Sequence, residues 1–303
     1  MESQYRQTWH LNSYEERRNF IRLLSLLQKA NLHEEVLDLW KRANKGLWEL
    51  CYWNDYFECT MIALDSTNSL HDFSSQSLIL REIGWSYMEW QDYDNAERYM
   101  NQSLQIAKSI QDDYNQCNSM RYLGILLYRK KDREISLDFY LQALRIIHNN
   151  RENISPIPKI EWAYQEASIH NLLGSVYLKL HNFSESYHQL NIAISQFEKL
   201  GKSYRYYQIP PLLNLGKWYL INKEYQKAKE FYEKSYQISK EISRTDTIAA
   251  SLFRLAEVYN EEKEYQNALN LLDKALEISG KEIIYVREKI FILIKKIKTN
   301  LEQ

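Results

Sequence analysis

Histidine side chains are the first residues in this sequence that could bind a metal ion or act as a catalytic base. His181 and His188 are seven residues apart, but His181 falls in a predicted turn and His188 in the helix that follows it. No cysteine or carboxylate lies at a spacing that would complete a metal site with them. His170 falls between packed helices, where a structural histidine is expected more often than a ligand. The histidines therefore predict neither a metal site nor a catalytic base.

The cysteines are the second candidates for chemistry. Cys51, Cys59 and Cys117 form no Cys-x-x-Cys pair, and their odd number argues against a disulfide framework. Cys51 and Cys59 are eight residues apart, near one face of a predicted helix, as expected for small buried apolar groups. We therefore expect three free thiols in a reducing compartment.

Acidic clusters and catalytic motifs complete the search for chemistry. The clusters Asp112-Asp113 and Glu261-Glu262-Glu264 fall in predicted turns and helix ends, where contact with water explains them. The chain contains no GxxxxGK[ST], GxGxxG, GxSxG or HExxH motif. The sequence therefore predicts a protein that is not an enzyme and has no cofactor.

Composition favours an all-α protein. Of the 303 residues 45% are hydrophobic, but only 7 are glycine and 4 are proline, too few for many tight β-hairpins. The 39 basic and 40 acidic residues give a net charge of −1, so no overall field favours nucleic acid or a membrane as partner. No signal peptide and no apolar stretch of 18 residues is present. We therefore expect a soluble cytoplasmic protein.

The elements that would position any site are helical hairpins, and residues 78–107 show the unit most clearly. Apolar residues recur at helical spacing, are interrupted by a polar turn near residue 92, and then resume. Gly84 inside the first helix costs about 1 kcal/mol against alanine, which indicates that another helix approaches too closely for a Cβ atom. Ala96, twelve residues later, is the small residue expected to face it.

This unit recurs along the chain. Five copies between residues 77 and 280 carry an apolar-Gly or apolar-Ala pair in the first helix, spaced 40, 50, 42 and 40 residues apart. These small residues are Gly84, Gly124, Gly174, Gly216 and Ala256. The ten surplus residues of the second interval contain Pro156 and Pro158, which predict a loop at about 148–160. Five copies in phase predict a stack of hairpins.

The two ends of the chain fit the repeat less closely. In residues 1–76, Ser13 and Glu16 form a capping box that predicts a helix start near Tyr14, and residues 20–43 fit a degenerate hairpin that turns at Asn31. Residues 47–66 keep helical spacing throughout and predict one aromatic-rich helix. Residues 281–303 predict an amphipathic helix that caps the last hairpin. A basic helix lying on a membrane surface is the alternative.

The repeated unit resembles the tetratricopeptide (TPR) repeat. Ile83-Gly84 stands for its Leu-Gly pair, Tyr87 for its tyrosine, and Ala96 and Ser103 for its small positions. Repeats of about 40 residues are similar to those of kinesin light chain arrays, and residues 48–145 resemble the TPR tails of bacterial STAND signalling ATPases. The resemblance implies one right-handed α-solenoid over residues 1–303, with about six to seven hairpins and a C-terminal capping helix.

TPR arrays bind peptides or partner helices in a concave groove lined by the first helix of each hairpin, the A helix. Transferring groove positions by their offset from each small residue gives Arg81, Trp85, Met88, Arg121, Tyr128, Asn171, Asn214, Lys217, Arg254 and Asn260. Arginine forks and asparagine amides can hold a peptide backbone or a carboxylate. The Lys and Asn pair of chaperone-binding TPR proteins is absent, since Trp85 stands at the Asn position. The alternative is that these are ordinary solvated residues.

The function implied is binding. We expect a protein or peptide partner, no nucleic acid and no membrane, and we leave a homo-oligomer open. A scaffold that acts as a bacterial regulatory or signalling adaptor is the leading hypothesis. The alternatives are a peptide-sensing receptor or the sensor module of a STAND-type signalling or defence system, and a structural assembly factor that uses its convex surface.

Overall fold

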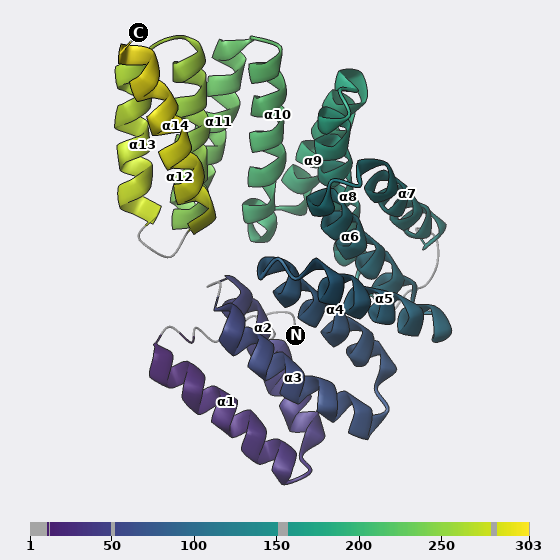
Figure 1. Ribbon diagram of the computed structural model, residues 1–303. Helices are drawn as coiled ribbons and strands as arrows, with labels where there is room; N and C mark the ends of the chain where they lie inside the picture. Colours follow the sequence, from purple (N-terminus) through teal and green to yellow (C-terminus); the bar gives the residue numbers. More distant parts are fainter. Residues whose placement is uncertain (1–10, 12, 50–51, 151–156, 280–283, 303) are drawn as a thin grey trace. The chain divides into compact units, whose positions relative to one another are not determined.

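The computed structural model describes residues 11, 13–49, 52–150, 157–279 and 284–302. These residues form fourteen α-helices and one 3-10 helix, with no strand among them, so the all-α prediction is confirmed (Figure 1). Within the same ranges, no helix combines the length and apolarity needed to cross a bilayer. The chain divides into two compact units, Met1–Asn153 and Ile154–Gln303, which we describe separately.

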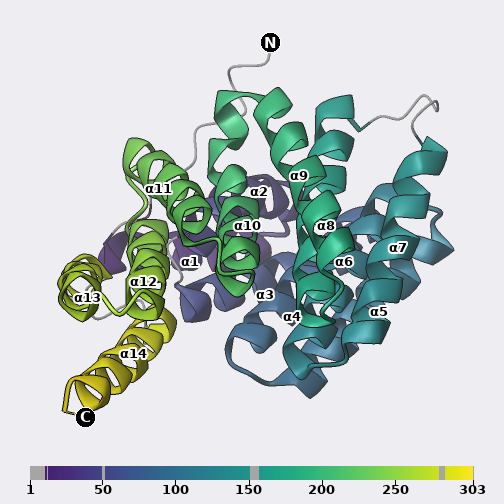
Figure 2. The same cartoon turned by 90° about the horizontal axis from the view of Figure 1, so that it is seen from above.

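Each unit is a series of antiparallel helices. Unit 1 contains α1 (Tyr14–Lys29), α2 (His33–Glu49), α3 (Trp53–Leu70), α4 (Phe73–Glu89), α5 (Tyr93–Ser109), α6 (Asp113–Lys130) and α7 (Arg133–Asn150). Unit 2 contains α8 (Lys159–Lys179), α9 (Phe183–Leu200), η1 (Lys202–Gln208), α10 (Ile209–Ile221), α11 (Tyr225–Glu241), α12 (Thr245–Glu261), α13 (Tyr265–Ser279) and α14 (Ile284–Glu302). The A helices are α4 and α6 in unit 1 and α8, α10 and α12 in unit 2. In unit 2, α10 contacts both α8 and α12 (Figure 2).

The glycines of the A helices mark where each hairpin closes. A Cβ atom on Gly84 would lie 2.7 Å from Met100 Cγ and 3.1 Å from the backbone oxygen of Ala96, so the predicted close approach is confirmed. On Gly124 it would lie 2.7 Å from Cδ1 of the Tyr140 ring. The facing side chain is sixteen residues ahead in each case, and the same spacing holds for the pairs Gly174–Leu190 and Gly216–Tyr232.

The turns between helices use left-handed backbone at a residue other than glycine. Positive φ angles of 54° to 74° occur at Asn31, His71, Gln91, Gln111, Lys131, His181, Lys223, Ser243 and Lys263. In the turn after α4, the Asp92 amide donates to the Tyr87 carbonyl at 2.9 Å, and the Asp92 carboxylate then accepts from the Asn95 amide and caps α5. The turn satisfies the end of one helix and starts the next.

The start of α1 agrees with the capping box in the sequence. The Glu16 amide donates to Ser13 Oγ at 3.1 Å, and the Ser13 amide donates to Glu16 Oε2 at 2.8 Å. The helix begins at Tyr14, and the first turn is at Asn31, so both predictions are confirmed.

The prediction of one helix over residues 47–66 is wrong. The α2 helix ends at Glu49 and α3 begins at Trp53. This turn contains neither glycine nor proline, and its residues continue the helical spacing of apolar side chains. Trp48 and Trp53 pack edge to face across it, with ring centroids 6.4 Å apart. The aromatic residues that seemed to extend one helix therefore join two.

The predicted loop at 148–160 is entered by helix from both sides. The α7 helix continues to Asn150, and α8 begins at Lys159 after Pro158 at its N-cap. Residues 151–156 lie outside the described ranges.

The last helix covers apolar residues of the final hairpin. In α14, Ile290 and Ile297 are fully buried and cluster with Ala249, Leu252 and Leu272 of α12 and α13. Figure 2 shows α14 beside those two helices. The whole-chain domain boundaries and the capping role stay predictions.

Candidate functional site

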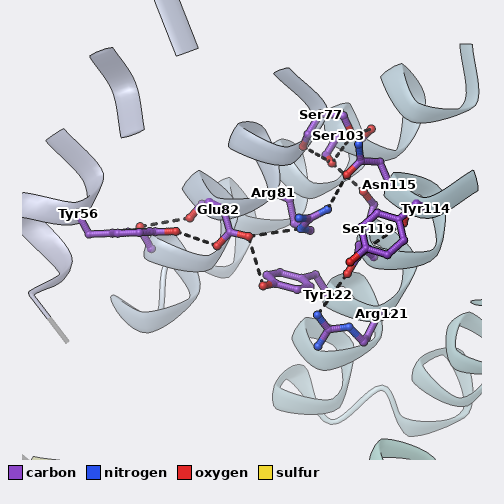
Figure 3. Close-up of polar contacts among 12 residues, drawn as sticks. Tyr56, Ser77, Arg81, Glu82, Ser103, Tyr114, Asn115, Ser119, Arg121 and Tyr122 are labelled. Carbon is purple, nitrogen blue, oxygen red and sulfur yellow. Dashed lines mark hydrogen bonds and ion pairs between the residues drawn. The ribbon is translucent and has the colours of Figure 1, made fainter. Parts of the chain in front are cut away.

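A polar network inside unit 1 surrounds the first predicted groove residue. Arg81 is only 4% exposed, and its Nε lies 3.5 Å from Glu82 Oε1 (Figure 3). Tyr56 of α3 donates to Glu82 Oε2 at 2.8 Å, and Tyr122 of α6 donates to Glu82 Oε1 at 3.3 Å. Arg81 Nη1 also donates to Asn115 Oδ1 of α6 at 3.3 Å. These contacts join α3, α4 and α6.

The electrostatics of this network are those of a structural pair. Burial raises the pKa of Tyr56 well above its usual value, and the Glu82 carboxylate adds to the rise, so the phenol stays a hydrogen-bond donor. The Arg81 guanidinium lies 5.0 Å from the Tyr122 ring centroid, which adds a cation–π contact. With its charge compensated and its surface covered, Arg81 serves packing and leaves little for a partner to bind.

Beside this network, Trp85 presents part of an aromatic surface. Its ring centroid lies 5.9 Å from that of Trp48 and 5.3 Å from that of Tyr122. The Arg129 guanidinium lies 5.5 Å from the Trp85 centroid and donates to Glu89 Oε1 at 2.7 Å. Trp85 is half-buried, so this face offers apolar contact with its nearby charges already paired.

Two other predicted groove residues of unit 1 lie on α6. Arg121 is half-buried, donates to Asn118 Oδ1 at 3.4 Å, and lies 4.8 Å from the Tyr122 ring centroid. Tyr128 is also half-buried. Both can reach a partner on the same face as Trp85.

One predicted groove residue is wrong for a physical reason, and another is largely withdrawn from solvent. Met88 is fully buried, and Asn260 is only 6% exposed. Each follows the small residue of its A helix by four positions, and residues four apart share one helical face. The offset that was to place them in the groove therefore keeps them on the packed side. Met88 is a core residue.

In unit 2, the A helices bring two amides together. Asn214 Nδ2 of α10 donates to Asn171 Oδ1 of α8 at 2.9 Å, and both side chains are half-buried. The remaining donor and acceptor capacity of such a pair suits a peptide backbone, which offers one N–H and one C=O per residue. The sequence predicted both residues, and the structure makes them neighbours.

One residue further along α10, Lys217 lies among other cations. Burial lowers the pKa of Lys217 to about 8, and the charges of Arg254 on α12 and Lys179 on α8 lower it further, while Glu257 opposes the shift. Arg254 Nη1 donates to Glu257 Oε2 at 2.6 Å, so this carboxylate is already engaged. Lys217 and Arg254 are half-buried and Lys179 is exposed. We call Lys179, Lys217 and Arg254 the cation cluster.

Lys179 was not among the predicted site residues. It lies five positions after Gly174, outside the offsets transferred from the repeat, at the end of α8. The sequence signal that could have found it is the basic residue in the last helical turn, although a cation there is also expected for the helix dipole alone.

Metal and thiol chemistry find no support in the described residues. No group of three or more His, Cys, Asp or Glu side chains in these ranges could hold a metal ion. His170 Nδ1 lies 2.5 Å from Gln189 Oε1, with Glu166 also near. Cys59 and Cys117 are buried free thiols, and burial raises the pKa of Cys117 to about 12, so its reactive thiolate is scarce. Cys51 lies outside the described ranges.

Comparison with known families identifies the hairpins. Models of the tetratricopeptide repeat match residues 76–147 and 165–241, and a further model of the same repeat matches residues 249–282. Together they cover more than half of the chain and coincide with the five copies found in the sequence. No curated protein matches the sequence significantly.

Several solved structures share this fold. A Rap protein complexed with competence and sporulation factor is 13% identical, with a TM-score of 0.59 over 94% of this chain and 87% of that one. The STAND protein of Pyrococcus horikoshii with a tetratricopeptide repeat sensor is 14% identical, with a TM-score of 0.61 over 95% of this chain and 43% of that one. A kinesin light chain-like TPR protein from Podosopora anserina is 17% identical, with a TM-score of 0.51 over 69% of this chain and 96% of that one. At these identities the similarity shows the fold alone, an all-α solenoid.

Proposed function

Because the chain belongs to the tetratricopeptide repeat family, we propose that it is a non-catalytic scaffold whose A helices bind a protein or peptide segment. The binding surface that we infer lies in unit 2, on α8, α10 and α12. Stacked hairpins present an extended surface held by neighbour contacts, which suits partner binding better than catalysis.

The observation that carries this proposal is the pairing of an amide contact with an excess of positive charge. Asn171 and Asn214 lie on the same helices as Lys179 and Lys217, and the one carboxylate that acts on the cluster, Glu257, is bound to Arg254. A partner segment with acidic residues would supply the missing negative charge, while its backbone would meet the amides. We therefore propose an acidic segment as the ligand.

The cellular role that we infer is that of a bacterial cytoplasmic regulatory or signalling adaptor. A second candidate is a peptide sensor, which the similarity to the Rap protein bound to competence and sporulation factor and to the STAND sensor favours. In that case the ligand is a free peptide and the response is a change between hairpins. Both roles use the same surface.

Selection of a random-peptide display library on the full chain tests the proposal. We expect enrichment of peptides with aspartate or glutamate, and about a tenfold loss of their affinity in the double variant Lys217→Glu, Arg254→Glu, which equals a loss of ~1.4 kcal/mol of binding free energy. The matched control is Lys227→Glu, Lys234→Glu, which makes the same charge change at exposed positions of the B helix α11.

The control variant is expected to bind the selected peptides as the unchanged chain does. Equal losses in both double variants would show that only net charge matters, and a set of selected peptides without acidic residues would contradict the proposal. Circular dichroism of each variant checks that the helices remain folded.

A further inference from the structure

The amine of Lys217 has an unusual environment for a lysine. In the described part of the chain, no carboxylate lies within ion-pair distance of it, whereas Lys227 and Lys229 of the adjacent α11 are paired with Glu224 and Glu262. The charged groups that act on Lys217 are Lys179 from α8 and Arg254 and Glu257 from α12. Its side chain is half-buried and therefore still reachable from solvent.

These surroundings favour the neutral form of the amine. Burial withdraws the ammonium from water, and two cations repel it, so its pKa falls to about 8. At pH 7 about a tenth of the side chain is then neutral, against less than about 0.1% for a lysine at its usual pKa of ~10.4. A neutral amine is a nucleophile, and an ammonium is not.

We propose that Lys217 is an acylation site that reacts with small anionic acyl donors, such as acyl phosphates, which Arg254 and Lys179 draw to it. The amine nitrogen forms a bond to the carbonyl carbon, and the carbon–oxygen bond to phosphate breaks. Phosphate leaves with the bonding electron pair, and the amine loses one proton to water. No oxidant or reductant is required, and the product is an amide.

The product also relieves the site. An amide carries no charge, so acylation removes the central cation of the cluster and ends its repulsion with Arg254 and Lys179. Because Lys217 lies on the surface proposed to bind acidic segments, the modification would weaken that binding. The chemistry itself does not depend on the proposed partner.

The test is incubation of the full chain with acetyl phosphate at pH 7, followed by quantitative peptide mass spectrometry of every lysine. We expect the initial rate at Lys217 to exceed that at Lys227 by about tenfold, because the larger neutral fraction outweighs the lower intrinsic nucleophilicity of a less basic group. Lys227 is the internal control, since it is exposed and its pKa is raised by its hydrogen bond and ion pair with Glu224. A rate at Lys217 equal to or below that at Lys227 overturns the proposal.

Two further measurements separate the roles of the amine and of its neighbours. The Lys217 rate is expected to level off above pH ~8, while the Lys227 rate keeps rising; a Lys217 rate that rises in parallel with Lys227 contradicts a low-pKa amine. In Arg254→Gln, the Lys217 rate with acetyl phosphate should fall by at least about threefold relative to the rate with neutral acetic anhydride, since only the anionic donor gains from the cation. An equal fall with both donors would remove the anion-attracting role from the proposal.

Discussion

Each unit places a cation on an A helix, and the two cations have opposite surroundings. Arg81 in unit 1 is covered, lies 3.5 Å from Glu82 Oε1, and donates to Asn115. Lys217 in unit 2 is half-buried, lacks a carboxylate within ion-pair distance among the described residues, and lies beside two more cations. A buried charge is tolerated when its own chain compensates it. The uncompensated one is the better candidate for a partner, and the contrast can be tested in stages.

Removing the compensation in unit 1 should have the largest effect. In Glu82→Gln, Arg81 keeps its charge but loses the only carboxylate of its network, and Tyr56 and Tyr122 lose a charged acceptor. We expect a loss of about 3 kcal/mol in the free energy of unfolding, as for a buried pair with one partner removed. Urea unfolding followed by circular dichroism measures it.

Glu89→Gln is the matched control, since it makes the same chemical change in the same helix. Glu89 accepts from Arg129 at a more exposed position, so its loss should cost less than about 1 kcal/mol. Similar losses in the two variants would mean that the unit 1 network is not buried compensation, and the contrast with Lys217 would fail.

The contrast also assumes that the hairpins pack alike in both units. Gly124→Ala tests this in unit 1 and Gly216→Ala in unit 2, because each new Cβ atom meets a tyrosine ring, that of Tyr140 or Tyr232. We expect each variant to lose about 2 kcal/mol of stability, since overpacking outweighs the helix propensity that alanine adds.

Gly84→Ala should be milder than these two variants. Its nearest neighbour is the flexible side chain of Met100, which can move, although the Ala96 backbone oxygen at 3.1 Å also has to give way slightly. Thermal unfolding of the three variants ranks them. Gly84→Ala as the most damaging of the three would contradict the packing described for both units.

The sequence was sufficient for most of the fold because the packing signal is local and repeats. A small residue in each A helix and another twelve positions later recur in phase, so Gly84 and Ala96 were placed correctly from spacing alone. The break between α2 and α3 was missed because its turn is made by aromatic residues that keep the helical period. Periodicity identifies packed faces, and a turn that preserves the period leaves no mark.

The site was less predictable, because side chains on different helices meet only in space. Asn171 and Asn214 were predicted singly, and only the structure shows that they hydrogen-bond. The offset rule failed at Met88, which shares the packed face of Gly84. Lys179 was missed because its contribution depends on charges of α10 and α12, and no spacing within α8 reports them.

Replacing the uncompensated cation should stabilise unit 2. In Lys217→Met the charge and its repulsion are lost and the apolar stem is kept, so we expect a gain of about 1 kcal/mol at pH 7 after allowing for solvent screening. The folded pKa of about 8 lies below the unfolded value near 10.4, so the unfolded chain binds more protons between these limits. The stability of the unchanged chain should therefore rise relative to Lys217→Met as pH increases through that window.

Parallel melting curves of the two proteins from pH 7 to 10 measure this difference. A Lys217→Met protein that is less stable at pH 7 would mean that Lys217 has a compensating partner after all. A difference that does not change with pH would separate the gain from titration of this amine.

The smallest effect concerns the turns, where the two units should not differ. Lys131 in unit 1 and Lys263 in unit 2 hold φ angles of 74° and 64°, in the left-handed region that costs a residue with a side chain about 1–2 kcal/mol. Replacement by glycine removes that cost but makes the unfolded chain more flexible, so we expect each variant to gain only about 0.5 kcal/mol. Lys274→Gly, at an exposed position inside α13, should instead lose about 1 kcal/mol. Equal gains at Lys131 and Lys263 would place the difference between the units in the charges on their A helices, whereas a gain confined to one unit would show that their turns also differ.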